Sequence, residues 1–414
     1  MSLYAMMVGG GITVDAVTSN MLPITARHFT DNVAFIAVLV AMNRICGTFV
    51  QPCAAKLSDR HRGAAGRRRP FFLVAWPATL VSVGLLGALP FLLPTGMHHT
   101  TLALVLLFVV NLAMQAALDV GFGCGEPLYG DMFRARELGM ASGVRALVFS
   151  LIAATMAYVA FPLADRHEFA PYAMSMLFLL ISSGIAFVYL REGTPASPLP
   201  HKQPGRWRPL AELKDRRLAW VAVVASCTLT ADALGTMLHA LFVVETLGLT
   251  KTDLGYVAAV GIGMRFLFSY PAGMMADRIG PRAVLLFGFL TFGAAAIGLA
   301  LFVDGLVGLY VGSALLAIGS TCANVPLTPI LFSDSPPERR GAIFAAVQFT
   351  RGVVVSVATI VMGFVANLAA SFRVCYLGAA CFCVLGIFAA VEIGRTVRTG
   401  RSALSNGVNA ADIV

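Results

Sequence analysis

Twelve long apolar runs are the feature of this sequence that most constrains its fold. The runs have 19 to 30 residues and few charges, which is long enough for an α-helix to cross the hydrocarbon core of a bilayer. Backbone groups in that core must be paired within the segment, so the runs predict helices. The runs are Leu3–Ala26, Val33–Leu57, Pro70–Leu93, Leu102–Tyr129, Gly139–Leu163, Tyr172–Leu190, Leu218–Leu247, Leu254–Ala276, Ala283–Val303, Leu306–Leu331, Gly341–Leu368 and Val374–Ile393.

The composition excludes a water-soluble protein. Of the 414 residues, 58% are hydrophobic and 12% are charged, whereas soluble domains have about 25% charged residues. The eight cysteines lie mostly inside the apolar runs and form no C-x-x-C pair, so we expect small core side chains and no metal site. The chain is therefore predicted to be an all-α membrane protein.

The distribution of positive charge gives the expected orientation. The net charge is +9, and most Lys and Arg residues lie in the loops that follow even-numbered runs and in the C-terminal tail. This is the positive-inside pattern, which predicts that both termini are cytoplasmic. We expect the run Arg67-Arg68-Arg69 to belong to this pattern and not to bind nucleic acid. The short loops favour a bacterial inner membrane.

The chain divides into two halves that resemble each other. The segment 191–217 contains five prolines and many basic residues, which is typical of a linker. It separates two predicted six-helix bundles, 1–190 and 218–394, and a tail, 395–414, that we expect to be disordered. Three pairs of residues recur between the halves in the same order, with offsets of 217, 221 and 218: Asp15 and Asp232, Arg44 and Arg265, and Asp59 and Asp277. A duplicated unit of this kind is typical of transporters with two parallel halves.

The loop motifs resemble those of the major facilitator superfamily. After the eighth run stands Gly273-Met274-Met275-Ala276-Asp277-Arg278-Ile279-Gly280-Pro281-Arg282, and after the second stand Asp59-Arg60 and Gly66-Arg67-Arg68-Arg69. Both resemble the G-x-x-x-D-R-x-G-R-R signature of that superfamily. The resemblance implies the major facilitator fold, with twelve transmembrane helices in two pseudo-symmetric bundles. An Asp at a helix end can pair with Arg and with a helix N-terminus. We therefore expect a cytoplasmic latch made by Asp59, Arg60, Arg67, Asp277, Arg278 and Arg282, and the resemblance adds Asp131 and Asp334 as gating residues.

A narrower resemblance covers about 25 residues. Val50-Gln51-Pro52, Ser58-Asp59-Arg60 and Gly66-Arg67-Arg68-Arg69-Pro70-Phe71 are similar to a stretch of the sucrose transporters and the glycoside-pentoside-hexuronide cation symporters. Asp119 and Pro127 loosely resemble an Asp…Pro element of the sucrose carriers. The Arg that follows this Pro in those carriers is replaced here by Leu128.

Four charged residues are expected near the middle of the membrane: Asp15, Arg44, Asp232 and Arg265. At about 1.5 Å per residue, Arg44 lies roughly 22 Å from Asp59 along its helix, which is beyond easy snorkelling. A charge at this depth costs on the order of 2.5–3.5 kcal/mol and therefore requires a role. Two interpretations remain open. The residues form buried ion pairs that hold helices together, or a carboxylate carries the driving proton while an Arg binds substrate.

Further polar residues are candidates for the same cavity. Asp119 lies in a run with several Gly residues and Pro127, and Asn324 precedes Pro326 in the tenth run. Such interruptions are tolerated in a membrane beside a cavity or in close packing. Arg351 is expected roughly 15 Å deep in the eleventh run. His239 is either a structural histidine or a proton relay.

These features predict a secondary transporter. It would move a small polar solute by alternating access, coupled to a proton or other cation gradient, with a sugar or glycoside first, an organic anion second and drug efflux third. The sequence contains no nucleophile elbow, no H-E-x-x-H and no Walker loop, so we expect neither an enzyme nor an ATP-driven pump. We expect no cofactor, and a monomer whose partners are the bilayer and a small-molecule substrate.

Overall fold

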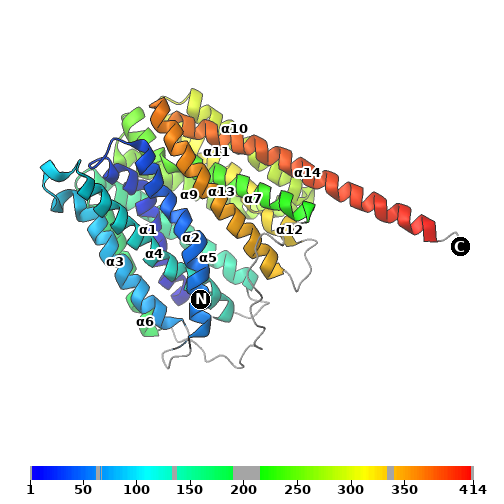
Figure 1. The fold of residues 1–414 in the computed structure, drawn as a ribbon, viewed down its shortest axis with the longest axis horizontal. Coiled ribbons are helices and arrows are strands. Elements are labelled where there is room, and N and C mark those ends of the chain that lie inside the picture. The colour runs from blue at the N-terminus through cyan, green and yellow to red at the C-terminus, as the bar shows by residue number, and fades with distance from the viewer. Residues whose placement is uncertain are drawn as a thin grey trace.

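The computed structural model shows a bundle of long helices in two halves (Figure 1). It describes the backbone of residues 2–61, 66, 68–132, 138–189, 215–332 and 340–411. Within these ranges the side chains of 2–8, 59–60, 126–132, 138–147, 186, 189, 328–329, 332, 340–342, 344–345 and 396–411 are not described. The expected linker therefore lies mostly outside the described residues.

The helices follow the apolar runs closely. Among the described residues, nine helices are long and apolar enough to cross a membrane. In chain order the elements are α1 (Ser2–Ala26), α2 (Val33–Arg60), α3 (Arg69–Leu92), η1 (Thr95–Met97), α4 (Thr101–Met132), α5 (Leu138–Ala164), α6 (Ala170–Tyr189), α7 (Arg216–Met237), α8 (His239–Leu241), η3 (Phe242–Thr246), α9 (Lys251–Ile279), α10 (Pro281–Leu301), α11 (Leu306–Asn324), α12 (Leu327–Phe332), α13 (Arg340–Ala369) and α14 (Arg373–Ala411).

The packing of the helices repeats between the halves. In the N-terminal half, α1 packs against α5 and α6, and α2 and α3 pack against α4. In the C-terminal half, α7 packs in the same way against α13 and α14, and α9 and α10 pack against α11. The duplication seen in the sequence is therefore also a duplication of packing.

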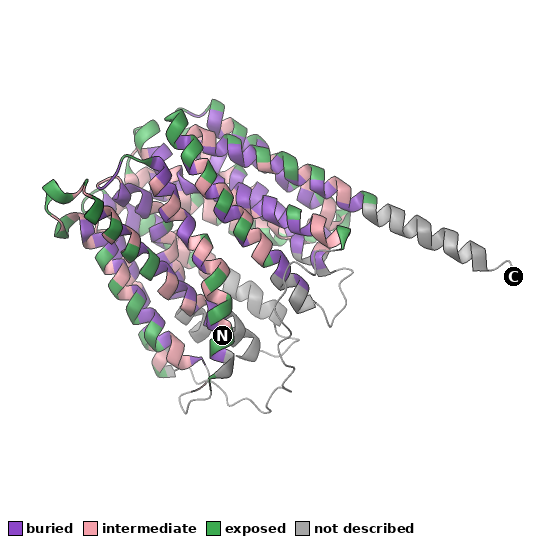
Figure 2. Ribbon diagram, in the orientation of Figure 1, coloured by how far each residue is buried: buried purple, intermediate pink, exposed green. Residues whose placement is uncertain are grey.

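Two equivalent contacts join the halves. Helix α2 packs against α13, and α5 packs against α9. Buried residues fill the space between the helices, whereas exposed residues lie along their outward-facing sides (Figure 2). Large apolar side chains on those sides, such as Val188 and Phe388, are exposed, as expected where lipid replaces water.

The structure differs from the predicted helices at three places. The seventh run breaks at Leu238 and continues as α8 and a π-helical turn, η3. The tenth run breaks before Pro326, which has no N–H to donate to the preceding turn. Helix α14 extends to Ala411, through the segment that we expected to be disordered.

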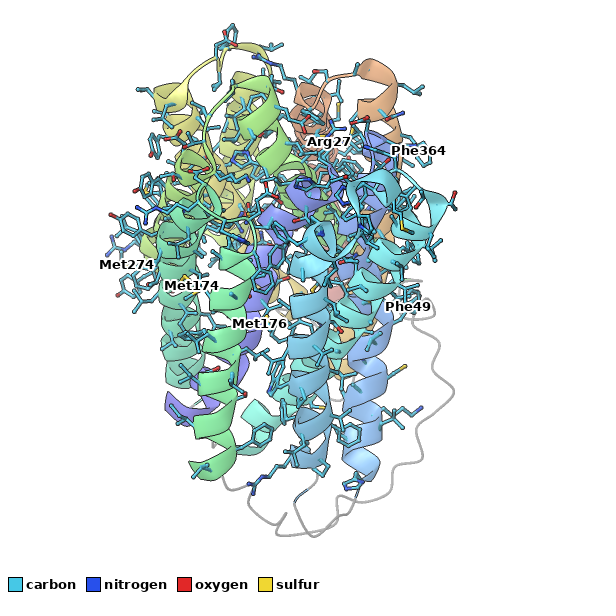
Figure 3. All side chains as sticks on the ribbon, turned by 90° about the vertical axis from the view of Figure 1, so that its left-hand side faces the viewer. Arg27, Phe49, Met174, Met176, Met274 and Phe364 are labelled. Atoms are coloured by element: carbon cyan, nitrogen blue, oxygen red, sulfur yellow. The ribbon has the colours of Figure 1, made fainter. Side chains whose placement is uncertain are left out.

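We call the end of the bundle that carries the N-terminus of α1 the proximal end, and the opposite end, where α1 ends and α2 begins, the distal end. Arg27 lies towards the distal end, and Phe49 lies nearer the proximal end (Figure 3). The sharp turn between α9 and α10 is at the proximal end. Gly280 occupies it with φ of 92°, a conformation that favours glycine and explains this Gly of the loop signature.

Candidate functional site

A cavity of about 340 Å³ lies between the two halves. Helices α1, α2 and α4 of one half and α7, α9, α11 and α13 of the other contribute to its wall. It brings together four of the predicted site residues, which are Asp15, Arg44, Asp232 and Arg265. The volume falls in the range of small-molecule sites.

Asp232 and Arg265 form an ion pair across α7 and α9. Arg265 donates from Nη2 to Asp232 Oδ1 over 2.6 Å and from Nη1 to Oδ2 over 3.4 Å. Ser320 of α11 donates a third hydrogen bond to Oδ1 over 3.0 Å. The carboxylate is thus compensated by a full positive charge and a hydroxyl, a charge-assisted arrangement that is stronger than a neutral hydrogen bond.

The equivalent residues in the N-terminal half are arranged differently. Asn43 donates from Nδ2 to Asp15 Oδ1 over 2.6 Å, and Arg44 lies in the cavity wall with an exposed side chain. No hydrogen bond or ion pair joins Arg44 and Asp15 in the described part of the chain. Arg44 is nevertheless near enough to interact electrostatically with both Asp15 and Asp232. The sequence repeat is therefore not a repeat of ion pairs.

Asp119 lies behind the cavity and not in its wall. The residue is 5% exposed, and its Oδ1 accepts a hydrogen bond from Gln51 Nε2 over 2.7 Å. One turn before it, Gln115 does line the cavity. Helix α4 is continuous here, and a Cβ on Gly123 would lie 2.5 Å from the carbonyl oxygen of Gln51. This glycine therefore allows α2 and α4 to approach closely instead of interrupting the helix.

Asn324 and Arg351 continue the polar chain from Asp232 towards the proximal end. Asn324 donates from Nδ2 to the carbonyl oxygen of Ser320 over 2.9 Å. Arg351 donates from Nη2 to Asn324 Oδ1 over 3.1 Å and from Nη1 to Gln348 Oε1 over 3.3 Å. Neither Asn324 nor Arg351 lines the cavity. Through Ser320 they connect α11 and α13 to Asp232, which does line the cavity.

His239 lies where the seventh span breaks. It lines the cavity, and its Nδ1 forms a hydrogen bond of 2.6 Å with the hydroxyl of Tyr376 on α14. The break at Leu238 thus places an imidazole between the cavity and α14.

The predicted latch residues are seen only in part. Arg282 donates to the carbonyl oxygens of Ala390 and Val391 within its own half. Asp277 and Arg278 are exposed at the end of α9, and no hydrogen bond or ion pair joins their side chains to another described residue. The side chains of Asp59, Arg60 and Asp131, and the residues Arg67 and Asp334, lie outside what the structure describes.

The halves are joined by charged residues at the distal end. Arg27, at the end of α1, donates from Nη2 to Glu245 Oε2 of the other half over 2.7 Å. Glu168, in the loop before α6, accepts hydrogen bonds from Lys251 of the other half and from His28 Nε2, the latter over 2.6 Å. The hydrogen bond from His28 is the largest effect on this carboxyl group, and with that from Lys251 it lowers the pKa of Glu168 to about 2.

A second carboxylate of the same loop caps a helix of the other half. Asp165 accepts hydrogen bonds from the backbone N–H of Lys251 over 3.0 Å and from that of Thr252 over 2.9 Å. These are the first N–H groups of α9, which have no partner within the helix and lie at the positive end of its dipole. Ion pairs and a helix cap therefore close the distal end over the cavity.

Sequence reasoning missed several of these residues. Asn43, Gln115 and Ser320 are polar residues inside apolar runs, and their neighbours Arg44 and Asp119 could have drawn attention to them. We call the charged contacts that join the halves at the distal end the distal closure; its residues are Arg27, His28, Asp165, Glu168, Glu245 and Lys251. These residues carry no such signal in the sequence. Their partners are separated by 83 to 218 positions, as for Glu168 with Lys251 and Arg27 with Glu245, and each alone is an ordinary loop charge.

Comparisons with known proteins agree with the fold. The family model described as Major Facilitator Superfamily matches residues 2–232 and 223–408 of this chain. No curated protein matched the sequence. A solved structure of the nucleoside transporter NupG (D323A mutant) is similar, with a TM-score of 0.69 and 13% identity, covering 94% of this chain and 99% of that one.

Two structures of a bacterial homologue of the iron transporter ferroportin are also similar. The inward-facing one has a TM-score of 0.69 and 14% identity, covering 95% of this chain and 98% of that one. The outward-facing one has a TM-score of 0.61 and 15% identity, with coverage of 95% and 100%. At these identities the likeness concerns the fold. The family match, which extends over both halves, shows that this chain belongs to the major facilitator superfamily of membrane transporters.

Proposed function

We propose that this transporter moves a small, neutral, polar solute through the cavity between its halves, by alternating access and coupled to protons. The observation that carries the proposal is the cavity itself. Each half contributes one carboxylate and one guanidinium group to its wall, the N-terminal half adds several amides, and together they surround about 340 Å³. A site shared by both halves can be exposed to either side of the membrane when the halves rock.

The polar wall favours a solute rich in hydroxyl groups, and a sugar or glycoside remains the first choice. Asn20, Asn43 and Gln115 contribute amides, which both donate and accept hydrogen bonds. Among the lining residues in the described part of the chain, His239 has the only ring, which gives little surface for stacking a nucleobase. The local resemblance to sucrose and glycoside carriers supports the same choice.

An organic anion is the alternative, and the structure weakens it. Arg265 is paired with Asp232, and Arg351 lies outside the cavity wall with amide partners. Arg44 is left as the cation that a carboxylate substrate could meet. Export of a cationic drug is the third possibility, for which Asp15 would be the contact.

Asp15 is the better candidate for the proton carrier. An amide partner such as Asn43 accommodates a carboxyl group in either protonation state, because it can donate or accept. Asp232 instead receives a guanidinium and a hydroxyl, both of which favour the carboxylate. In this proposal Asp232 and Arg265 keep a fixed charge pattern while Asp15 exchanges the proton.

The distribution of basic residues supports a cytoplasmic location for the proximal end and both termini. The distal end then faces outward, and the closure over the cavity corresponds to a state that is closed to the outside. We propose a monomer in a bacterial inner membrane, with Asp277, Arg278 and the other signature residues gating the cytoplasmic side.

Uptake into proteoliposomes with an imposed pH gradient tests the proposal. The liposomes are screened with labelled sugars and glycosides, carboxylates and cationic dyes. We expect uphill accumulation of a sugar or glycoside that collapses when a protonophore removes the gradient. Accumulation of carboxylates alone would favour the organic anion, and sugar uptake that ignores the gradient would exclude proton coupling.

Substitutions test the different roles proposed for Asp15 and Asp232. We expect Asp15→Asn to lose uphill accumulation but to retain exchange of substrate across the membrane, because exchange requires no net proton movement. We expect Asp232→Asn to lose both, because it leaves Arg265 uncompensated beside the substrate. Full uphill uptake by Asp15→Asn would contradict the assignment of the proton to this residue.

A further inference from the structure

His28 occupies a special position in the distal closure. It lies just after α1 and is bonded to Glu168 of its own half, whereas Lys251, the other partner of Glu168, belongs to the opposite half. When the distal end opens, Lys251 departs while His28 and Glu168 stay together. We infer that His28 senses external protons, and that its protonation weakens the hold of Glu168 on Lys251 and favours the state that is open at the distal end.

The direction follows from the charges. A protonated His28 compensates Glu168 from within its own half, so the attraction of this site for Lys251 decreases. It also places two cations on one carboxylate in the closed state and only one in the open state. By reciprocity, any state that removes Lys251 holds the proton on His28 more tightly, so acid favours that state.

His28 has access to protons from solution. Its side chain is 38% exposed, and that of Glu168 is 27% exposed. Histidine is the side chain that ordinarily changes charge between about pH 5 and 8. The pKa of Glu168 is lowered to about 2, mainly by the hydrogen bond from His28, so this carboxylate remains charged over that range.

His28 has a second histidine and several permanently charged groups around it. The ring of His98, from the loop before α4, lies 6.5 Å from that of His28. Lys251, from the other half, bonds to the same carboxylate as His28, and Asp165 accepts a hydrogen bond from the backbone N–H of Lys251. Arg27, adjacent in sequence, pairs with Asp31 and Glu245. Lys, Arg and carboxylate side chains ordinarily keep their charge between about pH 5.5 and 7.5.

The inference is tested by measuring the distance between the distal ends of the two halves. Gly96 and Gly305 lie in exposed loops of opposite halves, and a Cβ at either position meets no atom within 4 Å. The variant G96C/G305C, with the eight native cysteines replaced, is spin-labelled in lipid nanodiscs. Pulsed electron paramagnetic resonance then gives the distance distribution at about pH 7.5 and at about pH 5.5, the range in which histidine titrates.

We expect the short distance of the closed state to dominate at the higher pH, and the ratio of open to closed molecules to rise about fivefold or more in acid, as for a typical coupling between two sites. His28→Gln, which keeps a neutral donor, should remain closed at both pH values. His28→Asn is a second non-titrating variant in case the first does not fold. Lys251→Met should be open at both. His98→Gln is the matched control and should respond like the parent.

Two results would overturn the inference. One is a parent distribution that does not change with pH, and the other is a His28→Gln variant that keeps the full response. The measurement requires no substrate and no gradient. Failure of sugar or proton transport by the protein would therefore be recognised separately from failure of this mechanism.

Discussion

At the scale of single residues, the two halves use equivalent carboxylates in different ways. Asp15 and Asp232 occupy equivalent positions in α1 and α7, but an amide approaches the first and a guanidinium approaches the second. The sequence indicated both positions because charges in the membrane are rare. It could not give the partners, because the choice between Asn43 and Arg44 depends on the rotation of α2 about its axis.

The pair of Asp232 and Arg265 leads to a prediction on stability. We expect Asp232→Asn and Arg265→Met each to lower the free energy of unfolding by about 1–3 kcal/mol, because each leaves a charge without its partner. The double variant should lose less than the sum of the two, since it removes both charges together. Thermal unfolding of the four proteins in detergent measures this coupling. Additive losses would show that the ion pair contributes no stability.

Glu168 leads to a prediction on pH. Its pKa is lowered from 4.5 to about 2 in the folded protein, so its contribution to stability is complete above about pH 4.5 and is lost as the pH falls towards 2. We expect Glu168→Gln to be less stable than the parent by about 2 kcal/mol at neutral pH, a value reduced for partial exposure. The difference should shrink below about pH 4 in thermal unfolding curves. A difference that is constant over this range would contradict the prediction.

At the scale of helices, the sequence predicted positions well and interruptions less well. Apolar length fixed the spans because a helix must match the bilayer. The break before Pro326 follows from proline chemistry, but the break at Leu238 has no proline or glycine beside it and depends on tertiary contacts such as that of His239 with Tyr376. The glycines of α4 suggested a loosened helix, whereas at Gly123 the missing side chain makes room for the backbone of α2.

Two residues cap the N-terminus of α9, and we expect them to have different roles. Thr250 stabilises the helix, whereas Asp165 stabilises the closed state. Thr250 caps this helix from within, by accepting from the N–H of Asp253, whereas Asp165 caps it from the other half. We expect Thr250→Ala to lower stability by about 1 kcal/mol, as is usual for a lost cap, and to leave the distal distance unchanged. Asp165→Ala should raise the open fraction at both pH values. The spin-label pair described above measures both, and an Asp165→Ala protein that stays closed would contradict the prediction.

At the scale of the whole molecule, the duplication was visible in the sequence but the state of the transporter was not. Three residue pairs at similar offsets were enough to predict two related bundles. The arrangement of those bundles depends on contacts such as Glu168 with Lys251 and α2 with α13, which involve residues without a common motif. A motif search therefore finds the fold and the mid-membrane charges, and only the folded structure shows which end is closed.

The contact of α2 with α13 provides a test of alternating access. Gly363 of α13 packs against Ala37 of α2, and a Cβ on Gly363 would lie 2.0 Å from the Cβ of Ala37. Neither alanine side chain can rotate away, so Gly363→Ala must push the two helices apart at this level of the bundle, where the halves meet near the distal end.

We therefore expect Gly363→Ala to shift the protein towards the state that is open at the distal end, with a longer distance between the labels at positions 96 and 305. The double variant A37G/G363A exchanges the two side chains, restores the space and should return the parent distribution. Gly298→Ala, at a helical position where a Cβ meets no atom within 4 Å, controls for the substitution itself. If Gly363→Ala only lowers the thermal stability and leaves the distance unchanged, this contact is kept in both states. The halves would then rock about the contact of α2 with α13 without separating there.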